Sequence, residues 1–273
     1  MAESTGILGG VCALSCQERP GSMLLDQRRQ QILTVIENEG IVALQQLTDR
    51  VGASESTVRR DLEYLEKIGQ IRRTRGGAAY VGESLTTLDE RSVQALPQKQ
   101  AVGRSAAALV SAGETVLLDG GTTTLEVARH LGGKPLQVVT NSLPVATLLS
   151  NQSQIELVLI GGYLYPKTGV ALGPLAMKAL EQVNVRRLFM SVGGITEKGL
   201  FNSNTLLADT ERSMLSAAEE VIVVTDSSKL GHSALAHLCP LDRVHRVVVD
   251  SGISETWKKI LADAGIALTI AEA

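Results

Sequence analysis

The residues best suited to chemistry form one loop, Asp119-Gly120-Gly121-Thr122-Thr123-Thr124, between an apolar run and a helical pattern. Glycines let a backbone approach an anion closely, threonines offer hydroxyl groups, and a following helix presents its positive end. Asp119 would repel a phosphate placed against it, so its carboxylate suits sugar hydroxyls or loop amides better. The loop lacks the endings of a P-loop and of a dinucleotide fingerprint, which disfavours nucleotide binding.

Similar short loops follow other apolar runs of the chain. They are Thr140-Asn141-Ser142, Gly161-Gly162, Gly193-Gly194 and Asp226-Ser227-Ser228-Lys229. Each loop alone is most simply explained as a tight turn or a helix cap. If the apolar runs are parallel strands, however, all these loops lie at one edge of a sheet, where ligands of such sheets bind. Together they indicate a site for a polar ligand, with Lys229 as its cation.

The elements that must position these loops alternate along the chain from residue 98 onward. The expected strands are residues 115–119, 136–140, 155–160, 188–192, 221–225 and 247–249. Helical patterns lie between most of them, for example at residues 99–111 and 123–131. Short apolar strands that alternate with helices predict an α/β domain with a mostly parallel, Rossmann-like sheet covered on both faces.

A second stretch with functional side chains is residues 54–65, which reads as a helix with two distinct sides. Its apolar stripe at i, i+4 and i+7 consists of Val58, Leu62 and Leu65. The side chains that project away from this stripe near the helix start are Ser56, Thr57, Arg59 and Arg60. Short polar and arginine side chains at the start of a helix are the ones that contact DNA in a major groove.

The surrounding residues complete a winged helix-turn-helix. Apolar residues at 32–36 predict a first helix and residues 44–51 a second one. Gly52 can take the left-handed conformation that ends a helix, and Ser54 can cap the next one. Two short apolar segments flank Thr74-Arg75-Gly76-Gly77, which predicts a hairpin or wing. We expect Arg73 and Arg75 of this wing to contact the DNA backbone or the minor groove.

Charge supports DNA binding locally. The whole chain has a formal net charge of −3, which does not suggest nucleic acid. Between residues 59 and 75, however, the cations exceed the acids by roughly three charges. A solvated charged helix face is the commoner reason for such a pattern. The turn, cap, apolar stripe and wing occur together in the order that the motif requires, and this favours DNA binding.

Length and composition bound the organisation. The 273 residues predict about two domains, and 44 % hydrophobic residues can supply both cores. We expect a disordered extension at 1–22, a DNA-binding domain at 23–81, a linker at 82–97 and an α/β domain at 98–273. No apolar run approaches the roughly 20 residues of a membrane span, and no secretory signal is recognisable. The sequence therefore predicts a cytoplasmic protein without membrane contact.

The motifs also resemble a known family. The segments Arg28-Arg29-Gln30-Gln31-Ile32-Leu33, Val51-Gly52-Ala53-Ser54-Glu55-Ser56-Thr57-Val58-Arg59-Arg60-Asp61-Leu62 and Arg75-Gly76-Gly77-Ala78 resemble the N-terminal signature of DeoR-family bacterial transcription regulators. The segments Leu118-Asp119-Gly120-Gly121-Thr122-Thr123, Val139-Thr140-Asn141-Ser142, Gly161-Gly162 and Thr225-Asp226-Ser227-Ser228-Lys229-Leu230-Gly231 resemble the sensor domain of that family.

The resemblance implies a homo-oligomeric repressor, a dimer or tetramer, on double-stranded operator DNA. Its sensor would be related to ribose-5-phosphate isomerase, and a phosphorylated sugar effector would weaken DNA binding without any cofactor. Carried over by position, the effector-binding residues are Gly121, Thr122, Thr123, Asn141, Gly162, Glu211 and Lys229, to which the residue argument adds Asp119. The chain departs from the commonest pattern at residues 201–205, a loop that would influence which sugar is bound.

Two other classes of function stay open from the residues alone. A sugar-phosphate isomerase or transferase with a DNA-binding appendage would need an acid/base pair, which Asp119, Glu211, Asp226 and Lys229 offer by composition. A plain interaction module would leave the strand-end loops without a ligand. Metal binding is disfavoured, because the spacing of His232, His237, Cys239 and His245 matches no common zinc motif.

Overall fold

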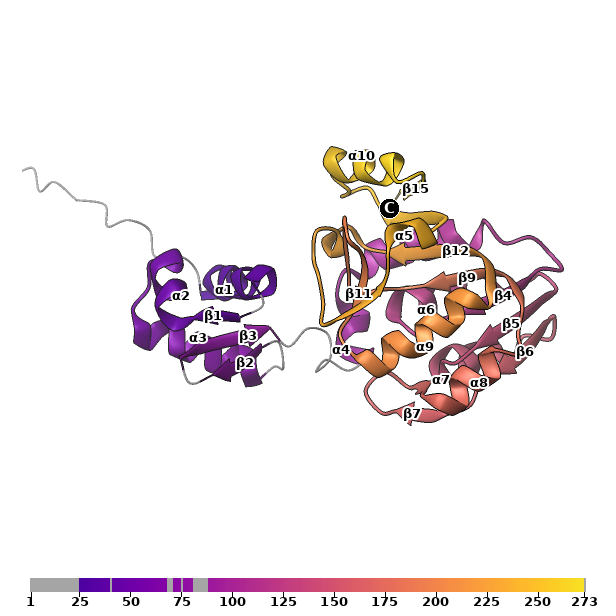
Figure 1. The fold of residues 1–273 in the computed structure, drawn as a ribbon, viewed down its shortest axis with the longest axis horizontal. Coiled ribbons are helices and arrows are strands. Elements are labelled where there is room, and N and C mark those ends of the chain that lie inside the picture. The colour runs from indigo at the N-terminus through magenta and orange to yellow at the C-terminus, as the bar shows by residue number, and fades with distance from the viewer. Residues whose placement is uncertain (1–24, 40, 68–70, 75, 81–87, 273) are drawn as a thin grey trace, which may run out of the picture.

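The N-terminal domain is a winged helix-turn-helix in the computed structural model, which describes residues 25–39, 41–67, 71–74, 76–80 and 88–272 (Figure 1). Its elements are α1 (Leu25–Glu39), β1 (Ile41–Ala43), α2 (Leu44–Val51), α3 (Glu55–Lys67), β2 (Ile71–Thr74) and β3 (Gly77–Tyr80). The strands form an antiparallel sheet in the order β1-β3-β2. Apolar side chains from all three helices and the sheet make one core, including Ile32, Leu47, Val58 and Ile71.

Local signals in the sequence set the turn between α2 and α3. Gly52 ends α2 with a φ of 62°, a conformation that glycine adopts without strain. Ser54 starts α3, because its Oγ accepts a hydrogen bond from the Thr57 amide at 3.3 Å. Both roles were predicted from the sequence and are confirmed.

Asp61 links the first helix of this domain to α3. Its carboxylate is 1 % exposed and accepts hydrogen bonds from Arg28 Nε at 2.6 Å and Arg29 Nε at 3.1 Å. The Arg29 guanidinium also lies 3.7 Å from the ring centre of Tyr64. Because the buried carboxylate is paired on both sides, these contacts fix how α1 packs on α3.

The predicted extension at 1–22 lies outside the described residues. The predicted linker at 82–97 is described from residue 88 onward, where it forms α4 (Leu88–Val93) and the start of α5 (Leu96–Ala107). The described part of the predicted linker is therefore helical and contacts the next domain. Its polar contacts, such as the hydrogen bond from the Leu88 amide to the Lys167 carbonyl, join residues far apart in the sequence and leave no local pattern.

The C-terminal domain is built on seven parallel strands in the order β15-β14-β12-β9-β4-β5-β6. The strands are β4 (Thr115–Leu118), β5 (Leu136–Thr140), β6 (Ile155–Leu159), β9 (Val185–Met190), β12 (Ala218–Thr225), β14 (Arg246–Asp250) and β15 (Ala267–Ala271). The chain adds strands outward from β4 to β6, then returns to β9 and adds strands in the opposite direction. This reversal between β4 and β9 is a topological switch point, where ligands bind in such sheets.

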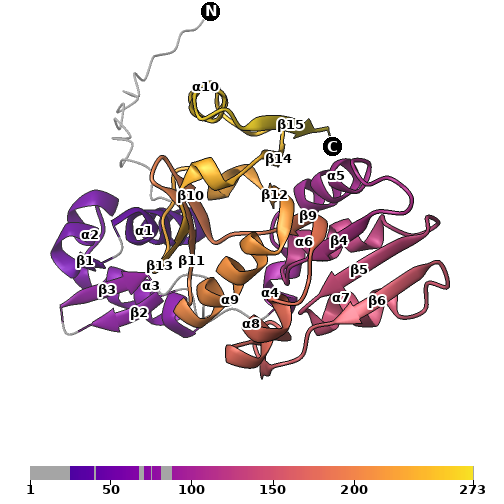
Figure 2. The same cartoon turned by 45° about the vertical axis from the view of Figure 1, so that its right-hand side comes forward.

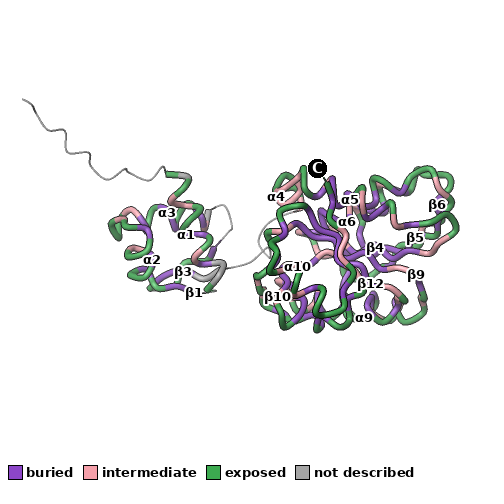
Figure 3. The backbone as a smooth tube through the Cα atoms, turned by 90° about the horizontal axis from the view of Figure 1, so that it is seen from above, coloured by how far each residue is buried: buried purple, intermediate pink, exposed green. Residues whose placement is uncertain are grey.

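Helices cover both faces of the sheet, as predicted. They are α6 (Thr122–Arg129), α7 (Leu143–Leu149), α8 (Pro174–Leu180), α9 (Thr205–Ser216) and α10 (Glu255–Asp263). Figure 2 shows α8 and α9 on one face of the sheet, with α6 and α7 behind it. The α5, α6 and α7 helices share one core with Val116 and Leu118, and the α8, α9 and α10 helices share the other with Leu117. The central strands, such as β4 and β9, are largely buried from both sides, as the purple centre of Figure 3 shows, whereas the edge strand β6 has exposed residues.

Short antiparallel strands and single helical turns surround this sheet and were not predicted. They are β7 (Tyr163–Tyr165), β8 (Val170–Leu172), β10 (Gly194–Thr196), β11 (Gly199–Asn202) and β13 (Ala236–Cys239), with the turns Ser227–Lys229 and Leu241–Arg243. β7 pairs with β8, and β11 lies between β10 and β13. These pieces follow the carboxyl ends of the long strands and therefore surround the predicted site.

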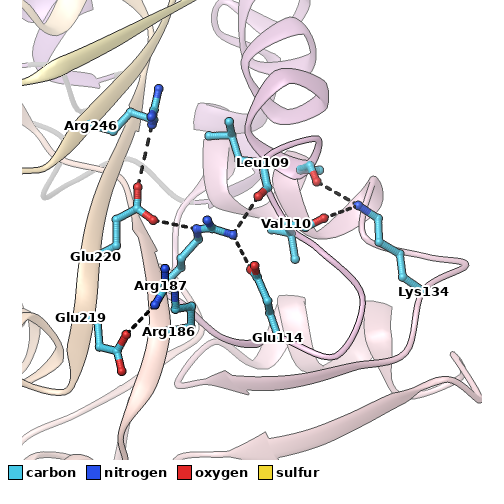
Figure 4. A network of polar contacts seen from close by, with 10 residues as sticks. Leu109, Val110, Glu114, Lys134, Arg186, Arg187, Glu219, Glu220 and Arg246 are labelled. Carbon is cyan, nitrogen blue, oxygen red and sulfur yellow. Dashed lines mark hydrogen bonds and ion pairs between the residues drawn. The ribbon is translucent and has the colours of Figure 1, made fainter.

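An ion-pair network joins the amino ends of the central strands, on the side of the sheet opposite to the strand-end loops (Figure 4). Arg187 on β9 binds Glu220 on β12 at 2.7 Å, contacts Glu114 before β4, and donates to the Leu109 carbonyl at 2.8 Å. Arg246 on β14 lies 3.9 Å from Glu220. Charged residues therefore hold together the amino ends of four neighbouring chain segments, away from the strand-end loops.

Candidate functional site

The exposed face of α3 carries the side chains that were predicted to contact DNA. Ser56 and Arg60 are exposed, and Thr57 is half-buried. The hydroxyls of Ser56 and Thr57 both lie within hydrogen-bond distance of Ser54 Oγ, at 3.0 and 2.8 Å. Arg59 pairs with Glu55 one turn earlier, with 2.5 Å between Nη2 and the carboxylate. Such exposed pairs are weak, so a phosphate could replace Glu55 at little cost.

The two cations that form no ion pair or hydrogen bond in the described part of this domain are Arg60 and Arg72. Arg72 was counted in the local charge but was not predicted as a contact residue. It is exposed on β2, next to the predicted Arg73. Arg60 on α3 and Arg72 on the wing are therefore the guanidinium groups most ready to contact phosphates or bases.

Arg73 is engaged within the protein. Its guanidinium pairs with Glu66 at 2.7 Å and with Glu63 at 2.9 Å, and its backbone amide donates to Glu66. The hydrogen bonds from Arg73 lower the pKa of Glu66. Arg73 thus fixes the wing against α3, and its contact with DNA stays a prediction. Arg75, the other predicted wing contact, lies outside the described residues.

The loop that begins at Asp119 lies at the switch point between β4 and β9. Its two glycines are required by close neighbours: a Cβ on Gly120 would lie 1.9 Å from Val170 Cγ1, and one on Gly121 would lie 2.1 Å from Ser191 Oγ. The Asp119 amide donates to the Phe189 carbonyl at 3.0 Å. The glycines therefore let β8 and the end of β9 close tightly around the loop.

Asp119 is fully buried in this loop, and neither carboxylate oxygen has a hydrogen-bond partner among the described residues. Burial raises the pKa of Asp119 to about 7. The amides of Gly120 and Ser191 and the charge of Arg91 oppose this rise, although neither amide meets hydrogen-bond geometry. A carboxyl group in this environment exchanges a proton near neutral pH.

Glu211 on α9 is the second buried acid of the site. Burial and the charge of Asp119 raise its pKa well above the usual range. Its Oε1 accepts a hydrogen bond from Asn202 at 2.7 Å, whereas Oε2 has no partner in the described chain. Two acids that disfavour each other's ionisation hold a proton between them more readily than either would alone.

Two more buried oxygen atoms have no partner in the described segments, and both belong to residues next to elements that border this loop. Asn141 directly follows β5, in register with Asp119 after β4, and its Oδ1 is unpaired while its amide donates to the Ala171 carbonyl. Thr168 Oγ1 is unpaired just before β8, whose Val170 touches the glycine loop. Leaving such atoms without partners costs free energy in most proteins. A ligand that donates hydrogen bonds would remove this cost.

The first turn of α6 adds a group of donors to the site. Thr122, Thr123 and Thr124 are buried, and Gly121 at the cap position provides no side chain to bind their amides. Thr124 Oγ1 donates to the Gly121 carbonyl at 2.9 Å, which keeps the turn rigid. Uncapped amides at a helix start favour an anion. The site therefore combines acceptors for hydroxyls with donors for a phosphate.

Gly162 and Lys229, two of the residues carried over from the family, act on other parts of the domain than the Asp119 loop. A Cβ on Gly162 would meet the Leu172 carbonyl at 2.8 Å and Ala176, so this glycine serves the packing of α8. Lys229 lies in the helical turn after β12. Burial is the main reason why the pKa of His232 is lowered, and the charge of Lys229 lowers it further. Neither the Gly162 contacts nor the Lys229 charge involves Asp119. Their part in effector binding stays a prediction.

Sequence reasoning missed three residues of this cluster: Arg91, Thr168 and Asn202. Asn202 lies in the segment that departs from the commonest family pattern, which was the one available signal. A groove of about 550 Å³ between α8 and α9 lies elsewhere, lined by residues such as Met177, Asp209 and Arg212. It contains none of the buried unpaired oxygen atoms, so the strand-end cluster is the better candidate.

Comparison with known proteins finds matches to both domains. Residues 28–84 match the family described as the DeoR-like helix-turn-helix domain, and residues 94–251 match the DeoR C terminal sensor domain. The regulator YulB of Bacillus subtilis, named as an uncharacterized HTH-type transcriptional regulator, is 33 % identical over 90 % of this chain and 97 % of its own. A putative aga operon transcriptional repressor of Escherichia coli O157:H7 is 34 % identical over 88 % of this chain and 91 % of its own.

Among solved structures, ribose 5-phosphate isomerase A of Methanocaldococcus jannaschii is similar at 21 % identity and a TM-score of 0.37. That match covers 48 % of this chain and 53 % of the isomerase.

The fold and the two sites define a DNA-binding transcription regulator with a ligand-sensing domain. The chain belongs to the DeoR family of regulators, because its domains match that family and it shares a third of its residues with a full-length member. The relatives are named as regulators, which agrees with a regulator and not with the alternative of an enzyme. No helix in the described part of the chain is long and apolar enough to cross a membrane.

Proposed function

We propose that this protein represses a sugar-metabolism operon and leaves its operator when a phosphorylated sugar binds beside Asp119. The observation that carries the proposal is the pairing of buried acceptors without partners with the uncapped start of α6. Asp119, Glu211 and Asn141 suit the hydroxyl groups of a sugar, and the α6 amides suit its phosphate. The relative named as a repressor of the aga operon supports the same direction of control.

The test is fluorescence anisotropy of the full-length protein on DNA from upstream of its own gene, at fixed salt. Each phosphorylated sugar of a panel is compared with the same sugar without phosphate. The proposal predicts that one phosphorylated compound releases the protein and that its unphosphorylated counterpart does not. Release by no compound would contradict the effector assignment, and steady turnover of a released compound would support the enzyme alternative.

We further propose that the protein acts as a homo-oligomer, so that two copies of α3 contact successive major grooves. The support is a group of exposed apolar side chains at and near the free edge of the sheet, which we call the edge surface. It consists of Val158 and Leu159 on β6, Tyr163 and Leu164 on β7, and Leu175 on α8. An edge strand with exposed apolar side chains is a pairing surface for another chain.

Light scattering on the purified protein tests this surface. Val158→Glu together with Leu159→Lys is expected to convert the oligomer into monomers. The exposed Leu235, which lies outside this surface and is 79 % exposed, gives the control Leu235→Glu. A monomeric native protein, or an oligomer that survives the double substitution, would contradict the proposal.

A further inference from the structure

Glu66, near the end of α3, holds the edge strand of the wing through two hydrogen bonds. β2 is an edge strand of the sheet β1-β3-β2, so no strand of the described domain binds the backbone groups on its outer side. The Arg73 amide on this strand donates to Glu66 Oε1 at 2.9 Å, and Arg73 Nε donates to Glu66 Oε2 at 2.7 Å. One carboxylate therefore binds both the backbone and the side chain of Arg73, which fixes orientation as well as distance.

The Arg73 side chain is directed toward α3. Successive side chains of a strand point to opposite faces, so Arg73 shares a face with the fully buried Ile71, whereas Arg72 lies on the other face. Ile71 belongs to the core that α3 also forms. Glu63, one turn before Glu66 on α3, binds the same guanidinium at 2.9 Å. The contacts of Arg73 are thus with the helix, and Arg72 is the wing cation on the outer face.

The wing and α3 enclose a groove of about 370 Å³. It is lined by Arg59 on α3, by Thr74 on β2 and by both Glu66 and Arg73. Arg59 is one of the predicted DNA contacts, so the side chains that attach the wing lie in the same groove as a predicted DNA-binding cation. A change in this attachment therefore changes the spacing between the wing and the cations of the helix.

An acid in this groove has two opposite effects on DNA binding. The hydrogen bonds from Arg73 lower the pKa of Glu66, so its carboxylate is charged at neutral pH and repels phosphates. The same carboxylate keeps the wing in place. Glu55 on the same helix carries an equal charge, but its hydrogen bonds in the described chain go to Arg59 and not to the wing. A comparison of Glu55 with Glu66 therefore separates the effect of charge from the effect of attachment.

We propose that Glu66 is a positioning residue for DNA binding, which holds Arg73 so that the wing keeps its place beside α3. The inference rests on the operator binding of the proposed function and is independent of the effector. Arg73 acts through Glu66 and not on a phosphate, and the wing presents Arg72 to the DNA. Glu66 thus favours DNA binding although its charge opposes it.

Fluorescence anisotropy of the full-length protein on operator DNA, at several salt concentrations, tests this role. Glu66→Gln is expected to weaken binding about three-fold, although it removes a negative charge. Arg73→Gln should weaken binding equally without changing the salt dependence. The double variant should match the single ones, because all three lose the same attachment. The control Glu55→Gln removes the same charge from the same helix and frees Arg59, so it should bind DNA at least as tightly as the native protein.

Unchanged or tighter binding by Glu66→Gln would overturn the proposal. A salt slope that falls by about 0.9 in Arg73→Gln would also contradict it, because that is the loss of one phosphate contact.

Amide hydrogen exchange without DNA is the second readout. Glu66→Gln should speed exchange of the Arg73 amide, while slow exchange of the Leu62 and Leu65 amides shows that the domain stays folded. Unchanged exchange at Arg73 would refute the attachment. A native protein that binds no tested DNA would contradict the proposed function, and the exchange at Arg73 would then decide the attachment by itself.

Discussion

Asn202 donates a hydrogen bond to Glu211 at 2.7 Å, between a strand end and the middle of α9. This bond fixes one carboxylate oxygen of Glu211 and leaves the other buried without a partner beside Asp119. Buried polar atoms are normally paired, but only one of the two carboxylate oxygens of Glu211 is. The unpaired half is what we expect an effector to bind.

Replacing Asn202 by Asp should destabilise the sensor domain at pH 8. The change removes the donor to Glu211 and adds a third carboxylate, at a cost of about 1–3 kcal/mol in the free energy of unfolding. The loss should shrink at pH 5, where a proton can be shared between the acids. Asn204→Asp is the matched control, because Asn204 caps α9 and aspartate caps equally well. Equal losses in both variants would contradict the assignment.

Asp119→Asn should change how stability depends on pH. The pKa of Asp119 is about 7 in the folded protein and about 3.9 in an unfolded chain. The native state therefore holds a proton that the unfolded state has lost, and native stability falls as pH rises from about 4 to about 7. Asparagine removes this fall, so the variant should gain about 1–3 kcal/mol relative to the native protein above pH 7. Denaturant unfolding across this range measures it, and a constant difference between the two proteins would refute it.

Gly120→Ala should disturb the site through a steric contact. The added methyl group would lie 1.9 Å from Val170 Cγ1, and overpacking of this kind costs about 1–3 kcal/mol. Gly161→Ala is the control, because no atom lies within 4 Å of the added carbon there. Combining Gly120→Ala with Val170→Ala should recover most of the thermal stability. A melting temperature for Gly120→Ala equal to that of Gly161→Ala would show that the loop tolerates a side chain.

Arg60→Ala should weaken operator binding by about 1–3 kcal/mol if Arg60 makes a bidentate contact with a base. The reason is that its guanidinium is exposed and has no partner in the described chain, whereas Arg73 is held by Glu63 and Glu66. Arg73→Ala should therefore cost less. Arg104→Ala, which removes an exposed cation on α5, controls for net charge. Unchanged affinity after Arg60→Ala would remove this residue from the interface.

The DNA-binding domain was predictable because its signals are local. The boundaries of α2, the left-handed Gly52 and the Ser54 cap depend on residues a few positions apart. The strand β1 was missed, since three residues give no alternating pattern. The prediction of an α/β sensor was also confirmed, because buried parallel strands are continuous apolar runs.

The starts of β9 and β12 and part of the candidate effector site could not be predicted from local signals in the sequence. β9 and β12 begin with charged residues, Arg187 and Glu220 among them, which pair with each other only after folding. Asn202 binds Glu211, and the charge of Arg91 acts on Asp119, only because the fold brings these residues close. No spacing in the sequence encodes such contacts, so Arg91 looked like part of a linker.

The most direct test of the account is a release curve on operator DNA with the active compound, comparing the native protein with Glu211→Gln. Both proteins should bind the operator, because Glu211 lies in the sensor domain. We expect the variant to need at least about ten-fold more compound for release, since one of the two carboxyl oxygens of Glu211 is replaced by an amide nitrogen that cannot accept a hydrogen bond. Release of both proteins at the same concentration would show that the effector does not bind at the Asp119 and Glu211 cluster.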